Sequence, residues 1–232
     1  MFDIDKWSGE FCRRLQNEFK GRLRFVGLQG SYKRGEATDS SDIDMVVILD
    51  EVSPRDLQRY RKLIAQMPYS HKACGFISGV EILKNWPRFD VFQLYCDTKA
   101  FIGTLSDFIA PFDTDEIRQA VVAGASAIYH AAAHSLVFDP VPEEAAKPLC
   151  KSAFFVIRCE RFLQTGAYPE TKAEAFLSAD ERERRFLSFD EKTPEILEDL
   201  MEWSGELLLK YGQKAKKDLP PSRDSQLRGN SL

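Results

Sequence analysis

The chain has 232 residues, enough for one large or two modest globular units, because single hydrophobic cores stop growing at roughly 250 to 300 residues. Hydrophobic residues make up 44% and charged residues 29%, a balance that excludes a disordered or fibrous chain. The 36 acidic residues outnumber the 32 basic ones and no basic stripe stands out, which disfavours binding of a long nucleic acid.

The sequence points to the cytoplasm. Its five cysteines are scattered and form no Cys-x-x-Cys pair, which favours free thiols over disulfides or a zinc site. The first residues lack the basic flank and apolar run of a signal peptide. No apolar stretch reaches about 18 residues without interruption, so we expect no membrane span.

The first half alternates between helical and strand patterns. Residues 2–20 carry apolar side chains at intervals of three and four, which predicts an amphipathic helix. Residues 53–68 open with Ser-Pro and predict a second helix. Four apolar runs predict strands, at residues 23–28, 42–49, 72–78 and 89–96. We expect an α/β or α+β domain with a small mixed sheet flanked by helices.

The second half is helical throughout. Four helical patterns begin near residues 114, 149, 174 and 194, and short connections between them predict a four-helix bundle. We therefore place an α/β domain at 1–112 and a helical bundle at 113–212. Residues 213–232 lack apolar periodicity, so we expect a disordered tail there.

Two carboxylates open the second predicted strand. Side chains alternate along a strand, so Asp42 and Asp44 point the same way at a separation of about 7 Å. Mg²⁺ is held by such hard carboxylates together with phosphate oxygens, and paired ions about 4 Å apart can clamp an in-line displacement. The Asp-x-Asp pair predicts a metal site.

Upstream of this pair, Gly30 and Ser31 follow the first predicted strand. Backbone N–H groups and the Ser31 hydroxyl at such a turn can cradle phosphate, and Lys33 and Arg34 add positive charge. Taken separately, a Gly-Ser turn and an Asp-x-Asp strand end are ordinary surface features. Their combination between two strands indicates a phosphate and metal site.

Residues 30–44 read Gly-Ser, then Arg-Gly-Glu, then Ser-Asp-x-Asp. This stretch resembles the signature of the DNA polymerase β-type nucleotidyltransferase superfamily, and it is most similar to the minimal nucleotidyltransferases and the aminoglycoside adenylyltransferases. Lys33 stands where the minimal enzymes usually carry a small residue. The resemblance implies transfer of a nucleoside monophosphate, AMP from ATP, to a hydroxyl, with two Mg²⁺ ions and release of pyrophosphate. It implies that Asp42 and Asp44 are catalytic metal ligands and adds Ser41 to the nucleotide-binding residues.

The same family usually has a third carboxylate on a neighbouring strand, as general base or metal ligand. Asp90 is the first choice, because an acid within the apolar run 89–96 is costly to bury without a partner. Glu81 and Asp97 are alternatives.

The helical half offers a candidate basic wall. Lys151 and Arg158 are seven residues apart and share a helix face, and Tyr168 and Lys172 follow the Gly166 stop. By resemblance to the adenylyltransferases, we expect Lys151, Tyr168 and Lys172 to close over the nucleotide. The alternative is a solvated surface.

Two functions compete. The first is an enzyme with ATP as donor and a hydroxyl acceptor on a small cationic molecule or on a protein, consistent with the mildly acidic charge. The second is a non-catalytic module that binds nucleotide or protein, similar to antitoxin components of the minimal-nucleotidyltransferase type. The sequence leaves the oligomeric state open.

Overall fold

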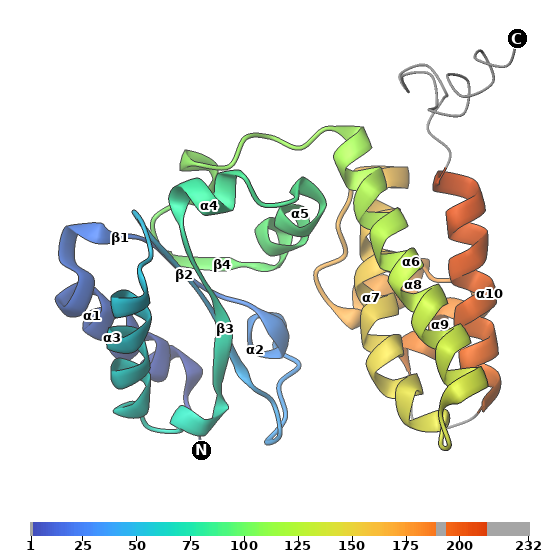
Figure 1. The fold of residues 1–232 in the computed structure, drawn as a ribbon, viewed down its shortest axis with the longest axis horizontal. Coiled ribbons are helices and arrows are strands. Elements are labelled where there is room, and N and C mark those ends of the chain that lie inside the picture. The colour runs from blue at the N-terminus through green and yellow to red at the C-terminus, as the bar shows by residue number, and fades with distance from the viewer. Residues whose placement is uncertain (1, 189–193, 213–232) are drawn as a thin grey trace, which may run out of the picture.

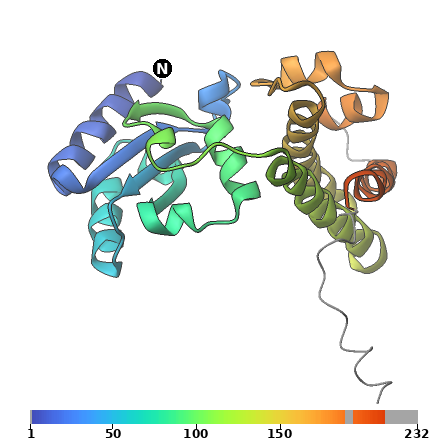
Figure 2. The same cartoon turned by 90° about the horizontal axis from the view of Figure 1, so that it is seen from above.

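The computed structural model describes residues 2–188 and 194–212. A mixed sheet with its helices lies on one side of the molecule, and the helices that follow residue 113 lie on the other (Figure 1, Figure 2). We refer to these two parts as the α/β half and the helical half. The predicted tail, 213–232, falls outside the described residues.

The sheet has four strands in the order β3-β2-β1-β4. They are β1 (Leu23–Leu28), β2 (Ile43–Leu49), β3 (Ala73–Gly79) and β4 (Lys99–Ile102). Strand β1 pairs antiparallel with β2 and β4, whereas β2 pairs parallel with β3. The sheet is therefore mixed, as the sequence predicted.

Helices cover both faces of this sheet (Figure 1). One face packs against α1 (Ile4–Phe19) and α3 (Pro54–Ala65), and the other against α4 (Val80–Lys84) and α5 (Arg88–Asp97). The short helix α2 (Gly30–Arg34) joins β1 to the loop that leads into β2.

Both faces of strand β2 are apolar. The alternation of side chains along the strand shows to which face its polar residue, Asp44, belongs. Ile43 and Met45 point towards α1 and α3, whereas Val46 points towards α4 and α5. Asp44 lies between Ile43 and Met45, so it belongs to the α5 face of the sheet. This places its carboxylate on the side of the helical half.

The predicted strand at 89–96 is wrong, because these residues form helix α5. This helix is buried on both sides, with Val91 packed into the sheet core and Phe92 into the core of the helical half. Apolar residues therefore surround the helix, and the helical periodicity that would identify it is lost. Strand β4, at the edge of the sheet, was not predicted.

The helical half contains five helices in the described residues. They are α6 (Thr114–Phe138), α7 (Glu143–Thr165), α8 (Lys172–Ser178), α9 (Glu181–Leu187) and α10 (Pro194–Tyr211). The third expected helix is two short helices, because the Asp180 side chain caps α9 and interrupts the run. The bundle therefore has three long helices and a short pair.

Within the described residues, α6 alone is long and apolar enough to cross a membrane by length and composition. It packs against α7 and α10, and it buries Ile117, Val121 and Ile128 in the core of the helical half. A core helix of a bundle has the same composition.

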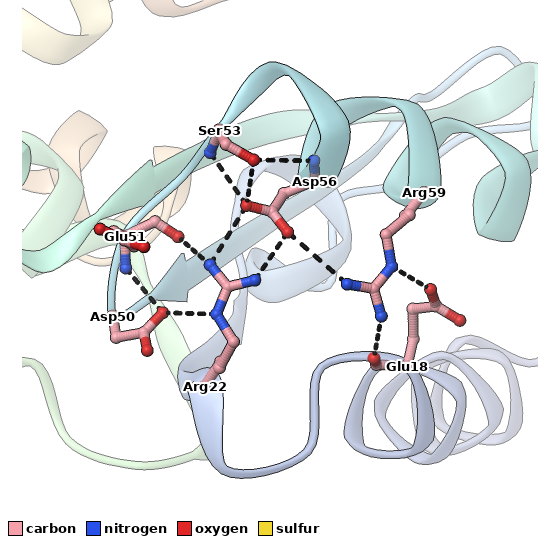
Figure 3. Close-up of polar contacts among 7 residues, drawn as sticks. All are labelled: Glu18, Arg22, Asp50, Glu51, Ser53, Asp56 and Arg59. Carbon is pink, nitrogen blue, oxygen red and sulfur yellow. Dashed lines mark hydrogen bonds and ion pairs between the residues drawn. The ribbon is translucent and has the colours of Figure 1, made fainter.

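An ion-pair network joins α1, β2 and α3 at the far end of the sheet from Asp44 (Figure 3). The Arg22 guanidinium donates to Asp50 at 3.1 Å and to Asp56 at 2.7 Å. The Asp56 carboxylate also accepts from the Ser53 hydroxyl and backbone, which closes the capping box of α3. Its hydrogen bond from Arg22 and those from Ser53 hold the pKa of Asp56 far below its usual value.

Candidate active site

Asp42 and Asp44 lie where the α2–β2 loop enters strand β2. Neither carboxylate accepts a hydrogen bond from any residue that the structure describes. Burial raises the pKa of Asp44, and the neighbouring charge of Asp42 raises it further, while Arg34 and Lys151 act in the opposite direction. Asp44 is therefore a half-buried carboxylate beside the like charge of exposed Asp42, and a bound cation would stabilise both.

Gly30 brings the backbone close to this pair. It has φ +69°, in the left-handed region, and a Cβ atom there would lie 2.1 Å from Asp44 Oδ2. The Gln29 amide donates to the Asp44 carbonyl at 2.8 Å, and the Gln29 side chain bonds Thr98 at 2.8 Å. Only glycine therefore allows the α2 turn to approach the Asp44 carboxylate.

A cleft of about 700 Å³ opens beside the two aspartates, between the two halves of the molecule. From the α/β half, its walls include Gly30, Ser31, Ser41 and both aspartates. Four cationic side chains also line it, and we call it the cationic cleft: Arg34, Lys147, Lys151 and Lys172.

A second cleft of about 410 Å³ adjoins the first. Apolar and aromatic side chains of β3, α4, α5, α7 and the α4–α5 loop contribute to its wall, and we call it the aromatic cleft: Phe76, Leu83, Trp86, Val91, Leu94 and Phe155. The two clefts share Gly30, Arg34, Asp44 and Phe155. Asp44 therefore stands where a positively charged space meets an aromatic one.

Six of the eight residues predicted to bind nucleotide line the cationic cleft: Gly30, Ser31, Arg34, Ser41, Lys151 and Lys172. The other two predicted residues lie in the contact between the halves. The Lys33 ammonium pairs with Glu170 at 3.0 Å, and the Tyr168 hydroxyl donates to Asp97 at 3.3 Å. Burial raises the pKa of Tyr168, and the charge of Asp97 adds to this effect.

The three candidates for the third carboxylate lie in different environments. Asp90 is exposed on the first turn of α5 and lines the aromatic cleft together with Asp44. Asp97 is buried and pairs with Arg158 at 2.5 Å. Glu81 is exposed on α4, pairs with Lys84 at 2.7 Å, and lines neither cleft.

The expected position of that carboxylate, on a neighbouring strand, is not observed. Asp90 lies on a helix, and β3 contains no acidic residue; Cys74 is the partner of Asp44 in the β2–β3 register. Across the described residues, no three His, Cys, Asp or Glu side chains gather as a metal-binding group. The acidic pair therefore stands alone on the sheet.

Sequence reasoning missed two contributors to the cationic cleft. Lys147 lies one helical turn before Lys151 on α7, and this spacing of four could have identified it. Glu36 accepts from Arg34 at 2.7 Å and from the Lys172 backbone amide at 2.6 Å. Nothing in the local sequence indicates the second contact, which joins residues far apart in the chain.

Comparisons with known proteins find relatives of the N-terminal part of this chain. Residues 9–77 match the model of the nucleotidyltransferase domain family. A protein of Methanocaldococcus jannaschii, named as a protein adenylyltransferase, is 42% identical over 46 residues, which cover 20% of this chain and 46% of that protein. The chain thus spans under half the length of this relative.

The fold resembles that of a solved adenyltransferase. The crystal structure of a spectinomycin adenyltransferase from Enterococcus faecialis, with ATP and spectinomycin, superposes with a TM-score of 0.59 at 14% identity. The match covers 88% of this chain and 99% of that one, so both halves contribute to the shared fold. The family match is thus confined to residues 9–77, and the likeness to the solved structure shows a shared fold.

Proposed function

We propose that the protein is an Mg²⁺-dependent nucleotidyltransferase that transfers AMP from ATP to a hydroxyl group and releases pyrophosphate. The observation that carries this proposal is the Asp42/Asp44 pair, which has no hydrogen-bond partner among the described residues and lies beside a cleft with four cationic side chains. A half-buried carboxylate beside a second negative charge is costly unless a ligand neutralises it.

The donor set suits Mg²⁺. Asp42 and Asp44 supply hard carboxylate oxygens, and the missing Cβ of Gly30 lets the Asp44 carboxylate lie against the α2 turn. When bound, the metal supplies positive charge that neutralises phosphate oxygens. The two aspartates would hold it.

The cationic cleft suits a triphosphate. The Ser31 hydroxyl and the α2 turn face this space, and Arg34, Lys151 and Lys172 line it. Lysine and arginine side chains stabilise the negative charge that shifts to the leaving pyrophosphate as the bond between the α-phosphorus and the bridging oxygen breaks.

The aromatic cleft suits the acceptor. A hydroxyl placed there would attack the α-phosphorus next to Asp44, and Asp90 would take its proton as general base. Three acidic residues line this cleft, Asp44, Asp90 and Asp97, and together with the aromatic wall they favour a small cationic molecule that carries a hydroxyl. A protein hydroxyl is the other acceptor class, in line with the name of the archaeal relative. We place this activity in the cytoplasm, away from membranes and long nucleic acids.

One observation favours a second candidate function. The acidic pair has no third carboxylate on the sheet, and Asp90 on α5 is exposed. A site without a working base would bind nucleotide without turnover, so the second candidate is a non-catalytic nucleotide- or protein-binding module of the antitoxin-like type.

Calorimetric titration of ATP with Mg²⁺ tests the proposal. The native chain should bind with micromolar affinity only when Mg²⁺ is present, and the Asp42→Ala, Asp44→Ala double variant should not bind. Labelled ATP and a panel of hydroxyl acceptors then separate the two candidates. AMP transfer that Asp90→Asn abolishes supports the enzyme, whereas Mg²⁺-dependent binding without transfer supports the module. Absence of binding by the native chain would rule out both nucleotide-binding functions.

A further inference from the structure

The segment 166–171, which links α7 to α8, lies between the two halves of the molecule. We call it the strap. Its Tyr168 ring packs against Phe92 of α5, and the Tyr168 hydroxyl reaches Asp97 at the end of the same helix. The Glu170 carboxylate pairs with Lys33 of α2 at 3.0 Å. The strap thus contacts two helices of the α/β half.

Arg158 of α7 is fully buried beneath the strap, whereas the sequence predicted a basic wall of the nucleotide site or, alternatively, a solvated surface. Its Nε donates to the Pro169 carbonyl at 2.5 Å, and its Nη2 donates to the Glu170 carbonyl at 3.4 Å. The guanidinium lies 4.3 Å from the centre of the Tyr168 ring. Arg158 therefore organises the strap through its backbone and through its one aromatic side chain.

The Arg158 guanidinium also contacts the α/β half. Its Nη2 lies 2.5 Å from the Asp97 carboxylate, and both side chains are buried. Arginine suits this place because its planar fork serves a carboxylate and backbone carbonyls together, which a lysine ammonium cannot do in the same geometry. One residue of α7 thereby ties the strap to α5.

The strap ends at the wall of the cationic cleft. The residue after it is Lys172, whose backbone amide donates to Glu36 at 2.6 Å and whose side chain lines the cleft. Glu36 in turn accepts from Arg34, another cation of that wall. Displacement of the strap would therefore move Lys172 and would release contacts to Arg34 and Lys33.

We propose that Arg158 is a positioning residue that, through Asp97 and the strap, fixes the cationic wall of the cleft opposite Asp42 and Asp44. This inference rests on the proposed function only in taking the cationic cleft as the nucleotide site. Arg158 lines neither cleft, whereas Lys151, two helical turns earlier on α7, lines the cationic cleft directly.

The test compares two double variants that each remove one buried ion pair from α7. Arg158→Met with Asp97→Asn removes the pair between the halves, and leaves no unpaired buried charge. Arg161→Met with Glu183→Gln removes a pair between α7 and α9, inside the helical half. Circular dichroism and thermal unfolding establish that both variants are folded.

Titration calorimetry with ATP and Mg²⁺ is the first readout. The Arg158/Asp97 variant should bind at least about tenfold more weakly, because small displacements of binding groups have large effects. The Arg161/Glu183 variant should stay within about twofold of the native Kd, since neither residue lines either cleft. Arg158→Lys, a milder change, should give an intermediate Kd.

Small-angle X-ray scattering is the second readout and needs no ligand. Loss of the Arg158 contacts should increase the radius of gyration, and the Arg161/Glu183 variant should match the native profile. A folded Arg158/Asp97 variant with native Kd, or equal weakening of ATP binding by both variants, would overturn the inference.

If the native chain binds no ATP, the proposed function fails, and an unchanged radius of gyration would then refute the positioning role separately. If the double variant does not fold, Arg158→Lys decides by the same two measurements.

Discussion

The two ends of strand β2 use aspartate in opposite ways. At its start, Asp42 and Asp44 accept no hydrogen bond from the described residues, and the pKa of Asp44 is raised by burial and by its neighbour. Just beyond its end, Asp50 and Asp56 bind one guanidinium (Figure 3), and the pKa of Asp56 is lowered. Along one strand, roughly 20 Å apart, aspartate side chains stabilise the fold at one end and accept no hydrogen bond from the described residues at the other.

Removal of the Asp42/Asp44 pair should have the largest effect on AMP transfer. Asp42→Ala with Asp44→Ala should lower AMP transfer from labelled ATP by at least about 1,000-fold, because the metal would lose its ligands. The thermal unfolding midpoint should stay at or above the native value, since a repulsion is removed. Asp50→Asn, at the other end, is the control and should retain near-native transfer. Loss of AMP transfer in both variants would contradict the proposed difference between the two ends of β2.

The Gly30 turn next to Asp44 should be the second most sensitive point. Gly30→Ala introduces a Cβ that collides with Asp44 Oδ2 and occupies a strained φ, so transfer should fall by about 100-fold. Gly35→Ala is a matched control, because Gly35 has φ +71° but no atom within 4 Å of its Cβ position. Both variants should lose about 1 to 3 kcal/mol of stability in urea unfolding. Equal loss of transfer in the two would show that the backbone strain, and not the contact with Asp44, matters.

Substitution of Asp56, beyond the end of β2, should lower the free energy of unfolding without changing AMP transfer. Asp56→Asn should lower the free energy of unfolding by about 1 to 2 kcal/mol at pH 7, through loss of the Arg22 ion pair and weaker hydrogen bonds from Ser53 to the side chain at position 56. Because folding lowers the pKa of Asp56, its contribution is present above about pH 4 and is lost as the pH falls further. Urea unfolding at pH 7 and at pH 3 should show the gap between native and variant close. A larger difference in the free energy of unfolding at pH 3 than at pH 7 would contradict a lowered pKa of Asp56 in the folded protein.

The smallest expected effect is a gain in stability at the start of the strand. Folding raises the pKa of Asp44, so its charge costs stability at neutral pH, and this cost disappears as the pH falls below the folded pKa. Asp44→Asn should therefore be more stable than the native chain at pH 7 by at most about 1 kcal/mol. Mg²⁺ should reverse this order, because only the native chain gains from binding it. Thermal scans with and without Mg²⁺ check both statements.

The motif was readable from the sequence because it is local. Gly30, Ser31, Asp42 and Asp44 act through a turn and one strand, and alternation alone places the two carboxylates on one face. Helix α5 was not readable, because it is packed on both sides and its apolar pattern carries no period. The error moved Asp90 from a strand to a helix.

Contacts between the halves were beyond sequence reasoning. Lys33 has the charge of a phosphate ligand, yet it pairs with Glu170, which lies 137 residues later. Arg158 has the spacing of a surface residue, yet it is the largest fully buried side chain. Charge and periodicity describe one element at a time, whereas these roles depend on how two elements meet. The boundary predicted at residue 112 is subject to the same restriction and stays a prediction.

Helix α5 also bears on how the chain can be divided. Phe92 belongs to the core of the helical half, Val91 to that of the sheet, and Phe112 packs against both. A fragment that ends near residue 112 would carry the first two side chains but expose the Phe92 ring to water, and the complementary fragment would lose a wall of its core. Helix α5 therefore contributes side chains to the cores of both halves. Separate expression of either half should yield an aggregation-prone protein. Insertions and fusions are better tolerated at the α6–α7 turn, where Asp139 and Pro140 are exposed.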